Sequence, residues 1–258
     1  MNIVLIGSGN MATQLGKAWT ASGDHQIVQV YNRTQANAEA LACALNTHYT
    51  SNIGDILTDA DIYLIAVSDS SIRTIADLLP EGLKGIILHC SGATSIDELS
   101  RFKNYGVIYP VQSISKTVDI SFKQVPIGIE FNNETIKNNL FNLIDSISDK
   151  AFSCSSDQRL AIHISAVFAN NFSNALFQIS KDILDQHHLD FDLIRPIILE
   201  TAKKVQNHFP EAVQTGPAIR NDKITMKKHL DFISSNQDWQ SIYQKISALI
   251  AKRTNNNS

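Results

Sequence analysis

Two short segments near the N-terminus carry residue types that could bind a dinucleotide. The first runs from Gly7 to Ala12 and directly follows an apolar stretch at residues 3–6. In a dinucleotide-binding turn the first glycine permits the bend, the second lets the backbone approach a pyrophosphate, and the third position needs a small residue, here Ala12. The expected cofactor contacts are Gly7, Ser8, Gly9, Asn10 and Met11. The alternative is a strand-to-helix turn that binds nothing.

The second segment, Asn32-Arg33-Thr34, follows the next strand pattern at residues 26–31. An NAD-binding unit usually places Asp or Glu here for the ribose 2′-hydroxyl, whereas a nearby Arg accommodates the 2′-phosphate of NADP. Asn32 carries no charge that would repel a phosphate, and Arg33 can bind it through two hydrogen bonds. Thr34 can donate a further hydrogen bond and cap the next helix. The sequence therefore predicts NADP rather than NAD.

The elements that must position these segments alternate between strand and helix patterns up to residue 154. Strand patterns lie at residues 47–50, 61–67, 85–90, 106–111, 125–131 and 151–154, and helix patterns at 35–45, 72–79 and 134–147. Alternation this regular predicts an α/β fold with a doubly wound, mainly parallel sheet and helices on both faces.

In such sheets ligands bind beyond the carboxyl ends of the strands. We therefore expect Val67, Ser68 and Ser91 to lie near the nicotinamide end of the cofactor. The alternative for these residues is ordinary turn and capping chemistry, in which Ser is common. His89 could equally be a core histidine whose ring is hydrogen-bonded or a histidine that takes part in the function of the site.

From Ser155 the pattern becomes helical. Ser155 and Gln158 have the spacing of a capping box, and an unbroken helix of about thirty residues, roughly 45 Å, should follow. Shorter helices are expected near residues 192–208, 222–232 and 239–252. We predict an NADP-binding domain at residues 1–154 and an all-α domain for substrate binding and dimerisation at residues 155–258.

The long predicted helix carries one polar stripe. At about 100° per residue, His163, Asn170 and Asn174 point in nearly one direction. The stripe could make hydrogen bonds between helices, or it could face a substrate cleft. In the second case His163 could act as a general acid, and Asn170 or Asn171 could hold a carbonyl or an imine.

The segment from Thr215 to Asp222 is the other unusual feature of the C-terminal half. Gly216-Pro217 forces a rigid turn, and Arg220 could clamp a carboxylate or a phosphate. A purely structural turn and cap is the competing interpretation.

The amino-acid composition limits the kinds of molecule that the protein is expected to bind. The chain has 258 residues, 18% of them charged, and a formal net charge of −3, so neither nucleic acid nor an anionic membrane is an expected partner. Three cysteines without metal spacing favour reduced thiols in the cytoplasm. A small-molecule substrate is expected. The largely apolar long helix predicts a homodimer through the C-terminal helices.

Together these motifs resemble a known group of proteins. The chain is similar to Rossmann-like NADP oxidoreductases of the deazaflavin-dependent type, and more closely to a group whose C-terminal helical domain is uncharacterised. The markers are residues 6–12, 32–34, 89–93, 109–113, His163 with Asn170-Asn171, and residues 215–222. The first marker is also similar to pyrroline-5-carboxylate reductases, and the two-domain plan resembles hydroxyisobutyrate and 6-phosphogluconate dehydrogenases.

One departure limits what the resemblance implies. Those hydroxyacid dehydrogenases place a Lys on the long helix with Asn four residues later, whereas this chain has no Lys between Lys150 and Lys181. The resemblance therefore implies architecture and cofactor but no catalytic base. We expect an NADP(H)-dependent oxidoreductase that moves a hydride to or from a small carbonyl or imine compound. The alternatives are a non-catalytic NADP sensor or scaffold and a deazaflavin-dependent reductase.

Overall fold

The computed structural model describes residues 1–116, 118 and 120–256. The chain forms two compact units, residues 1–171 and 172–258. The predicted boundary after residue 154 coincides with the end of the sheet, but the first unit also includes the helix that follows. That helix stays with the sheet because its buried Arg159 is bonded to it, as shown below.

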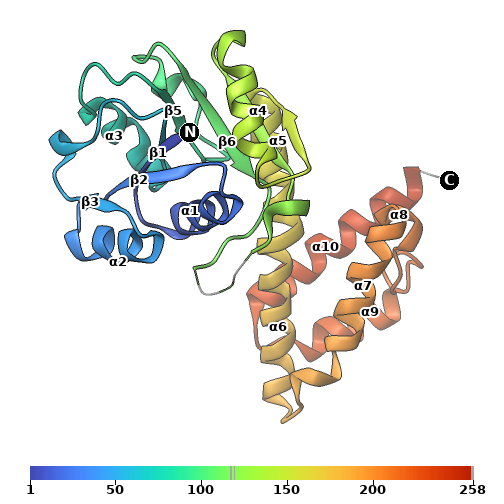
Figure 1. Cartoon of the computed structure of the whole chain (residues 1–258). Helices are drawn as coiled ribbons and strands as arrows, with labels where there is room; N and C mark the ends of the chain where they lie inside the picture. Colours follow the sequence, from blue (N-terminus) through green and yellow to red (C-terminus); the bar gives the residue numbers. More distant parts are fainter. Residues whose placement is uncertain (117, 119, 257–258) are drawn as a thin grey trace. The chain divides into compact units, whose positions relative to one another are not determined.

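The first unit, drawn with its strands as arrows in Figure 1, is built on one sheet. The strand order of this sheet is β3-β2-β1-β4-β5-β6-β7-β8. The strands are β1 (Asn2–Ile6), β2 (Gln26–Tyr31), β3 (His48–Thr50), β4 (Ile62–Ile65), β5 (Ile86–His89), β6 (Tyr105–Pro110), β7 (Ile127–Phe131) and β8 (Ala151–Ser153). Pairing is parallel from β3 through to β6, whereas β7 runs antiparallel to β6 and parallel to β8. The predicted α/β class with a mainly parallel sheet is confirmed.

Helices cover both faces of this sheet. They are α1 (Asn10–Ser22), α2 (Gln35–Leu45), α3 (Ile72–Leu78) and α4 (Lys137–Asp145). Alternate residues of β1 serve different faces: Leu5 packs in one apolar cluster with Trp19 of α1, and Ile6 packs in another with Ile72 of α3. The doubly wound architecture follows from this alternation.

The long helical stretch after the sheet has three parts. They are α5 (Ser156–Ala166), a π-helical segment (Val167–Phe172) and α6 (Ser173–Gln186). The predicted capping box is confirmed, because Ser155 accepts a hydrogen bond from the Gln158 N–H and the Gln158 side chain accepts one from the Ser155 N–H. The predicted long helix is present from Ser156 to Gln186, but its middle segment is π-helical and not α-helical. A π-helix has i→i+5 hydrogen bonds. The rotation of 100° per residue, which holds for an α-helix, therefore does not apply across residues 167–172.

The second unit is helical, as predicted. After α6 come α7 (Arg195–Asn207), α8 (Pro210–Val213), α9 (Lys223–Phe232) and α10 (Gln237–Asn256). Pro196 lies in the first turn of α7, and Asp222 caps α9 by accepting a hydrogen bond from the Thr225 N–H at 3.0 Å. Within the described residues, no helix combines the length and apolarity needed to cross a bilayer.

His89 is a core histidine at the end of β5. Its side chain has no exposed surface. Nδ1 accepts a hydrogen bond from the Ser91 N–H at 3.2 Å, and Nε2 lies 3.3 Å from the Ser95 carbonyl oxygen. The two contacts require a neutral ring with the proton on Nε2. Burial, followed by the positive charge of Arg159, lowers the pKa of His89 to about 4.

This pKa predicts an acid-sensitive fold. In the unfolded chain His89 returns to its ordinary pKa of 6.5, so the unfolded state binds a proton as pH falls below 6.5 while the folded state does not. The free energy of unfolding should therefore fall by about 3 kcal/mol between about pH 6.5 and pH 4. Urea unfolding at several pH values measures this loss, and His89→Gln should flatten it. The exposed His48→Gln is the control, and an equal pH dependence in His89→Gln and the unmodified protein would contradict the assignment.

Candidate functional site

The turn between β1 and α1 depends on Gly7, whose φ is +110°. A Cβ atom at Gly7 would lie 2.4 Å from the carbonyl oxygen of Ala66, just beyond β4. The Gly7 N–H donates a hydrogen bond to the Tyr31 carbonyl oxygen at 2.8 Å. The ends of β1, β2 and β4 therefore meet around one residue that must lack a side chain.

Helix α1 starts immediately after this turn. The residue before it, Gly9, offers no side chain to cap the first-turn N–H groups, and a helix N-terminus with free N–H groups attracts anions. Asn10 is held in another direction, because its Nδ2 donates to the Ile114 carbonyl oxygen at 3.0 Å. The amide of Asn10 thus ties the turn to the segment after β6.

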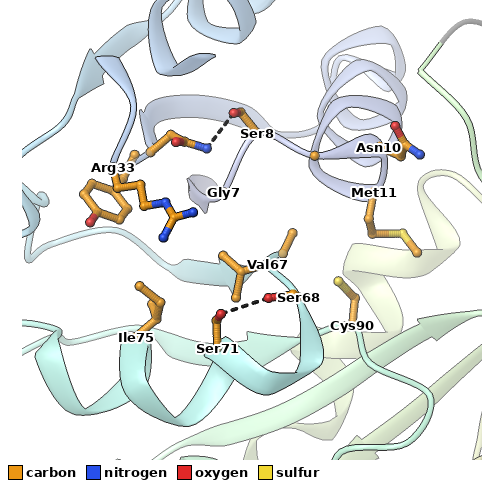
Figure 2. A pocket seen from close by; sticks show the side chains of 14 residues that line it. Gly7, Ser8, Asn10, Met11, Arg33, Val67, Ser68, Ser71, Ile75 and Cys90 are labelled. Carbon is orange, nitrogen blue, oxygen red and sulfur yellow. Dashed lines mark hydrogen bonds between the residues drawn. The ribbon is translucent and has the colours of Figure 1, made fainter. Parts of the chain in front are cut away.

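A cavity of about 390 Å³ opens beside the turn (Figure 2). Its lining comes from the carboxyl ends of β1, β2, β4 and β5 and from the helices that follow them. The residues are Gly7, Ser8, Gly9, Asn10, Met11, Tyr31, Asn32, Arg33, Ala66, Val67, Ser68, Ser71, Ile75 and Cys90.

The segment after β2 forms one wall of this cavity. Asn32 Nδ2 donates to Ser8 Oγ at 2.7 Å, and Asn32 Oδ1 accepts from the Thr34 N–H at 2.9 Å. In Figure 2 the exposed Arg33 guanidinium reaches over the cavity toward Gly7 and Val67. Thr34 does not line the cavity, and its side chain makes no capping hydrogen bond to α2. The capping role predicted for the Thr34 side chain is therefore wrong, because the Asn37 N–H donates instead to the Thr34 carbonyl oxygen at 3.0 Å.

The opposite wall follows β4. Val67 and Ser68 line the cavity, and Ser68 Oγ lies 2.8 Å from Ser71 Oγ at the start of α3. Val67 and Ser68 thus line the same cavity as Gly7 and Arg33, and their position near the nicotinamide stays a prediction.

A second cavity, of about 900 Å³, adjoins the first and shares Met11 and Cys90 with it. Its walls are the loop after β5, the end of β6 with the residues that follow, α5 and part of the π-helical segment. The lining residues are Met11, Asp69, Cys90, Ser91, Gly92, Tyr109, Pro110, Val111, Gln112, Ser113, Ala161, Ile162, His163, Ser165, Ala166, Val167, Ala169, Asn170 and Asn171.

A tyrosine and a histidine make a hydrogen-bonded pair on the wall of this second cavity. Tyr109 OH lies 3.1 Å from His163 Nδ1, and the two rings meet edge to face at 77°. Burial raises the pKa of the Tyr109 phenol; the charge of Arg159 opposes this rise and the charge of Asp69 adds to it. The phenol is therefore protonated at neutral pH and could donate its proton to a bound molecule, with His163 as the partner that restores it.

Cys90 lies at the junction of the two cavities but is not a nucleophile. Burial, with a smaller contribution from Asp69, raises the pKa of the Cys90 thiol to about 12. Because the thiolate is the reactive form of cysteine, Cys90 serves here as a small apolar wall.

The other predicted residues divide between the two units. Ser91 lines the second cavity rather than the first, and its Oγ accepts from the Thr94 N–H at 3.0 Å. Asn170 and Asn171 line the second cavity together with His163. Arg220 lies in the second unit, on an exposed turn before α9.

Some residues of the cavities were not among the predicted site residues. Tyr109 lies one residue before the end of β6, at the same sheet edge as the other loops, so its position along the strand is the signal that could have found it. Asp69 and Gln112 follow strand ends in the same way. Arg159 carried no signal of its own, because a single charged residue in a helix is ordinarily exposed.

Two family models match separate parts of the chain. The model "NADP oxidoreductase coenzyme F420-dependent" matches residues 2–88, and the domain of unknown function DUF2520 matches residues 125–250. A comparison with curated proteins finds no match.

Solved structures cover nearly the full length. The "putative NADP oxidoreductase" of Bacteroides fragilis is 33% identical, with a TM-score of 0.87 over 97% of this chain and 98% of that chain. A 1-pyrroline-5-carboxylate reductase of Streptococcus pyogenes is 14% identical, with a TM-score of 0.65 over 98% of each chain. An imine reductase of Myxococcus stipitatus in complex with NADP+ is 16% identical, with a TM-score of 0.65 over 98% of this chain and 93% of that chain.

The last two likenesses are to proteins of low identity and show a common fold. The first shows more, because a third of the residues are identical over almost all of both chains. The predicted cofactor class, NADP, agrees with the first family model and with this relative. The protein therefore belongs to the NADP oxidoreductase family of the Bacteroides fragilis protein, with a Rossmann-like domain followed by a helical DUF2520 domain.

Proposed function

We propose that the protein reduces a small imine or carbonyl compound with NADPH. The cofactor would occupy the cavity at Gly7 and supply the hydride, and the substrate would occupy the adjoining cavity. The observation that carries this proposal is the Tyr109–His163 pair, which lies on the wall of a cavity contiguous with the nucleotide cavity. The reacting carbon accepts the hydride, and its nitrogen or oxygen accepts the Tyr109 proton, so the double bond becomes a single bond.

The residues of the first cavity fit NADP. Gly7 lets the turn pass close to the Ala66 backbone, where a Cβ would clash, and the uncapped N-terminus of α1 offers N–H groups to a pyrophosphate. The wall that follows β2 contains the amide of Asn32 and the guanidinium of Arg33. None of the described residues that line the cavity carries a carboxylate. A 2′-phosphate would meet a cation there and no opposing charge.

Arg33→Ala should separate the two nicotinamide cofactors. A charge-assisted hydrogen bond contributes about 1.5–3 kcal/mol, so the Kd for NADPH should rise by about 10- to 100-fold while the Kd for NADH changes little. Isothermal titration calorimetry with both cofactors measures this. Arg73→Ala, on the exposed surface of α3, is the matched control. Equal losses for NADPH and NADH would show that Arg33 does not bind the 2′-phosphate.

The proton donor can be tested on the second cavity. Tyr109→Phe removes the donated proton and His163→Ala removes its partner, so turnover should fall by about 100- to 10,000-fold in each case. NADPH affinity should stay unchanged, because neither residue lines the first cavity. Steady-state NADPH oxidation and a binding titration measure the two quantities, and His48→Ala is the matched histidine control. Full turnover in both variants would refute the assignment.

The charges around the second cavity bear on the substrate class. Asp69 is the one charged side chain among its described lining residues, and Gln112, Asn170 and Asn171 add neutral amides. This lining suits a neutral carbonyl compound or a neutral imine, which Tyr109 would protonate, better than a carboxylate. A panel of imines and carbonyls, with and without a carboxylate, tests the substrate class.

Two alternative functions predict other results in the same assay. A sensor or scaffold would bind NADPH tightly and turn over nothing, and a deazaflavin reductase would turn over that flavin alone. The family model that mentions the deazaflavin coenzyme ends at residue 88. The matched residues therefore include neither Tyr109 nor His163, nor most of the other residues that line the second cavity. The match supports the nucleotide site and not a flavin site.

We also propose a homodimer formed through the C-terminal helices, and a cytoplasmic location, which the three free cysteines favour. In the second unit Ala218 is the one described side chain that is less than 9% exposed. Large apolar side chains there stay exposed, such as Leu193 at 65%, Ile197 at 65% and Ile224 at 74%. Patches of this kind ordinarily mark protein interfaces, and symmetric association of identical chains is the commonest solution.

The oligomeric state is measured by light scattering on the full chain. The expected mass is twice that of the 28.5 kDa chain. Ile197→Glu should shift it toward one chain, because a buried unpaired carboxylate opposes association, while NADPH affinity reports that the first unit is intact. Leu78→Glu, on the exposed surface of α3, is the matched control. A monomer at every concentration of the unmodified protein would exclude the dimer.

A further inference from the structure

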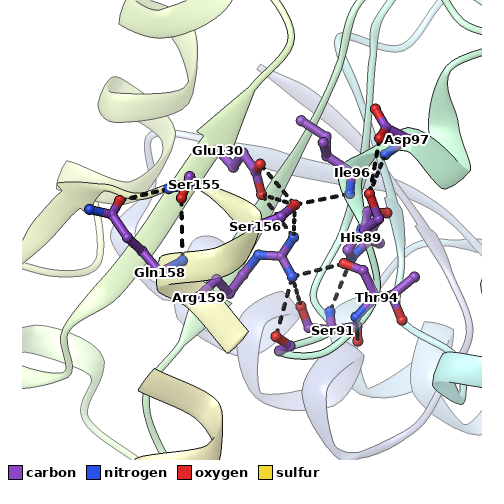
Figure 3. Close-up of polar contacts among 12 residues, drawn as sticks. His89, Ser91, Thr94, Ile96, Asp97, Glu130, Ser155, Ser156, Gln158 and Arg159 are labelled. Atoms are coloured by element: carbon purple, nitrogen blue, oxygen red, sulfur yellow. Dashed lines mark hydrogen bonds and ion pairs between the residues drawn. The ribbon is translucent and has the colours of Figure 1, made fainter. Parts of the chain in front are cut away.

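Arg159 is a buried cation that the proposed reaction does not use. It lies on α5, one turn before His163, and its side chain is 1% exposed. Figure 3 shows the guanidinium at the centre of a polar network drawn from three parts of the first unit. Nη2 donates to Glu130 Oε2 at 2.8 Å and to Ser156 Oγ at 3.0 Å.

The other terminal nitrogen binds the loop that follows β5. Nη1 donates to the carbonyl oxygens of Ser91 at 3.0 Å, Gly92 at 3.3 Å and Thr94 at 2.8 Å. These three carbonyls come from four consecutive residues, so one nitrogen fixes the course of the whole loop. Nε has no partner among the described residues.

Stability alone does not account for this arrangement. A buried ion pair loses about as much in desolvation as it gains in attraction, and apolar replacements are often as stable. The geometry is specific, however: the planar fork holds a carboxylate with one nitrogen and the loop with the other, which a single ammonium group cannot reproduce. The network therefore specifies a position rather than adding to the core.

The position that it specifies is that of the His163 ring. A Cβ atom at Gly92 would lie 2.6 Å from both Cγ and Nδ1 of His163. Nδ1 is the same atom that contacts Tyr109 OH at 3.1 Å. The ring therefore lies against the loop that Arg159 holds, so a shift of that loop moves the contact between His163 and Tyr109.

We propose that Arg159, paired with Glu130, is a positioning residue that fixes the loop at residues 91–94 against α5 and so sets the contact between His163 and Tyr109. The inference rests on the proposed function, because it assigns the network to the proton-donating pair of the second cavity. Arg159 does not line that cavity, and it acts through His163.

The first test needs no substrate. The imidazole resonances of His163 are assigned in NMR spectra of the full chain by their loss in His163→Ala. Arg159→Lys should shift or broaden these resonances while the Kd for NADPH changes less than about twofold. Arg73→Lys makes the same chemical change at an exposed ion pair and should leave them in place. Unchanged His163 resonances in a folded Arg159→Lys protein would overturn the proposal.

The second test uses turnover and separates positioning from general stability. Arg159→Lys should lower kcat by about 10- to 100-fold, the scale expected for a displacement of about 1 Å in a reacting group. In a His163→Ala background the same change should have no further effect, because its target is gone. Equal losses in both backgrounds would overturn the proposal. Full turnover in His163→Ala alone would instead refute the proposed function.

Gly92→Ala alters the contact between the loop and His163 without changing the ion pair of Arg159 and Glu130. The added Cβ should displace the His163 ring and reproduce the NMR shift and the loss of kcat. This variant keeps the proposal falsifiable if Arg159→Lys does not fold. A folded Gly92→Ala protein with native His163 resonances and full kcat would show that the loop does not set the position of His163.

Discussion

The close approach of Gly7 to the Ala66 carbonyl is the constraint on which the first unit depends. At this point the backbone leaving β1 passes so near the end of β4 that a Cβ would lie 2.4 Å from an oxygen. Helix α1 starts just beyond this point, uncapped because Gly9 has no side chain, and its first residues line the nucleotide cavity. Because β1 lies between β2 and β4 in the sheet, the segments after both neighbours become the two walls of that cavity.

The two cavities at this edge of the sheet are lined by groups of different chemistry. The nucleotide cavity is shaped by backbone and by hydroxyl, amide and guanidinium groups, which suit a phosphate. The second cavity places a protonated phenol beside an imidazole. The strongest local cation, Arg159, is kept out of that cavity by its bonds to Glu130 and three carbonyls. The charge of Arg159 therefore acts on Tyr109 in the second cavity, while the guanidinium does not line that cavity and offers no anion site there.

The sequence was informative where function follows from local backbone geometry. The strand-turn-helix pattern around Gly7, the strand ends near Val67 and Ser68, and the capping box at Ser155 are all local patterns, and the structure has each of them. Contacts between distant segments were not predictable. Tyr109 and His163 are brought together by tertiary packing, and nothing near Arg159 in the chain indicates that it would bond to the loop after β5. The Thr34 side chain does not cap α2, because the Asn37 N–H donates to the Thr34 carbonyl oxygen instead.

The π-helical segment changes part of the polar stripe predicted on the long helix: His163 and Asn170 line one cavity as expected, joined by Asn171 and not by Asn174. In an α-helix consecutive residues point about 100° apart, so Asn170 and Asn171 could not both face one cavity easily. A π-turn holds more residues, and each successive side chain is rotated by less. Both amides line the second cavity together with His163. π-Helical turns are rare, occur mostly within α-helices and lie frequently at functional sites. The segment at Val167–Phe172 therefore fits a helix whose geometry is set by the cavity it lines rather than by local propensity.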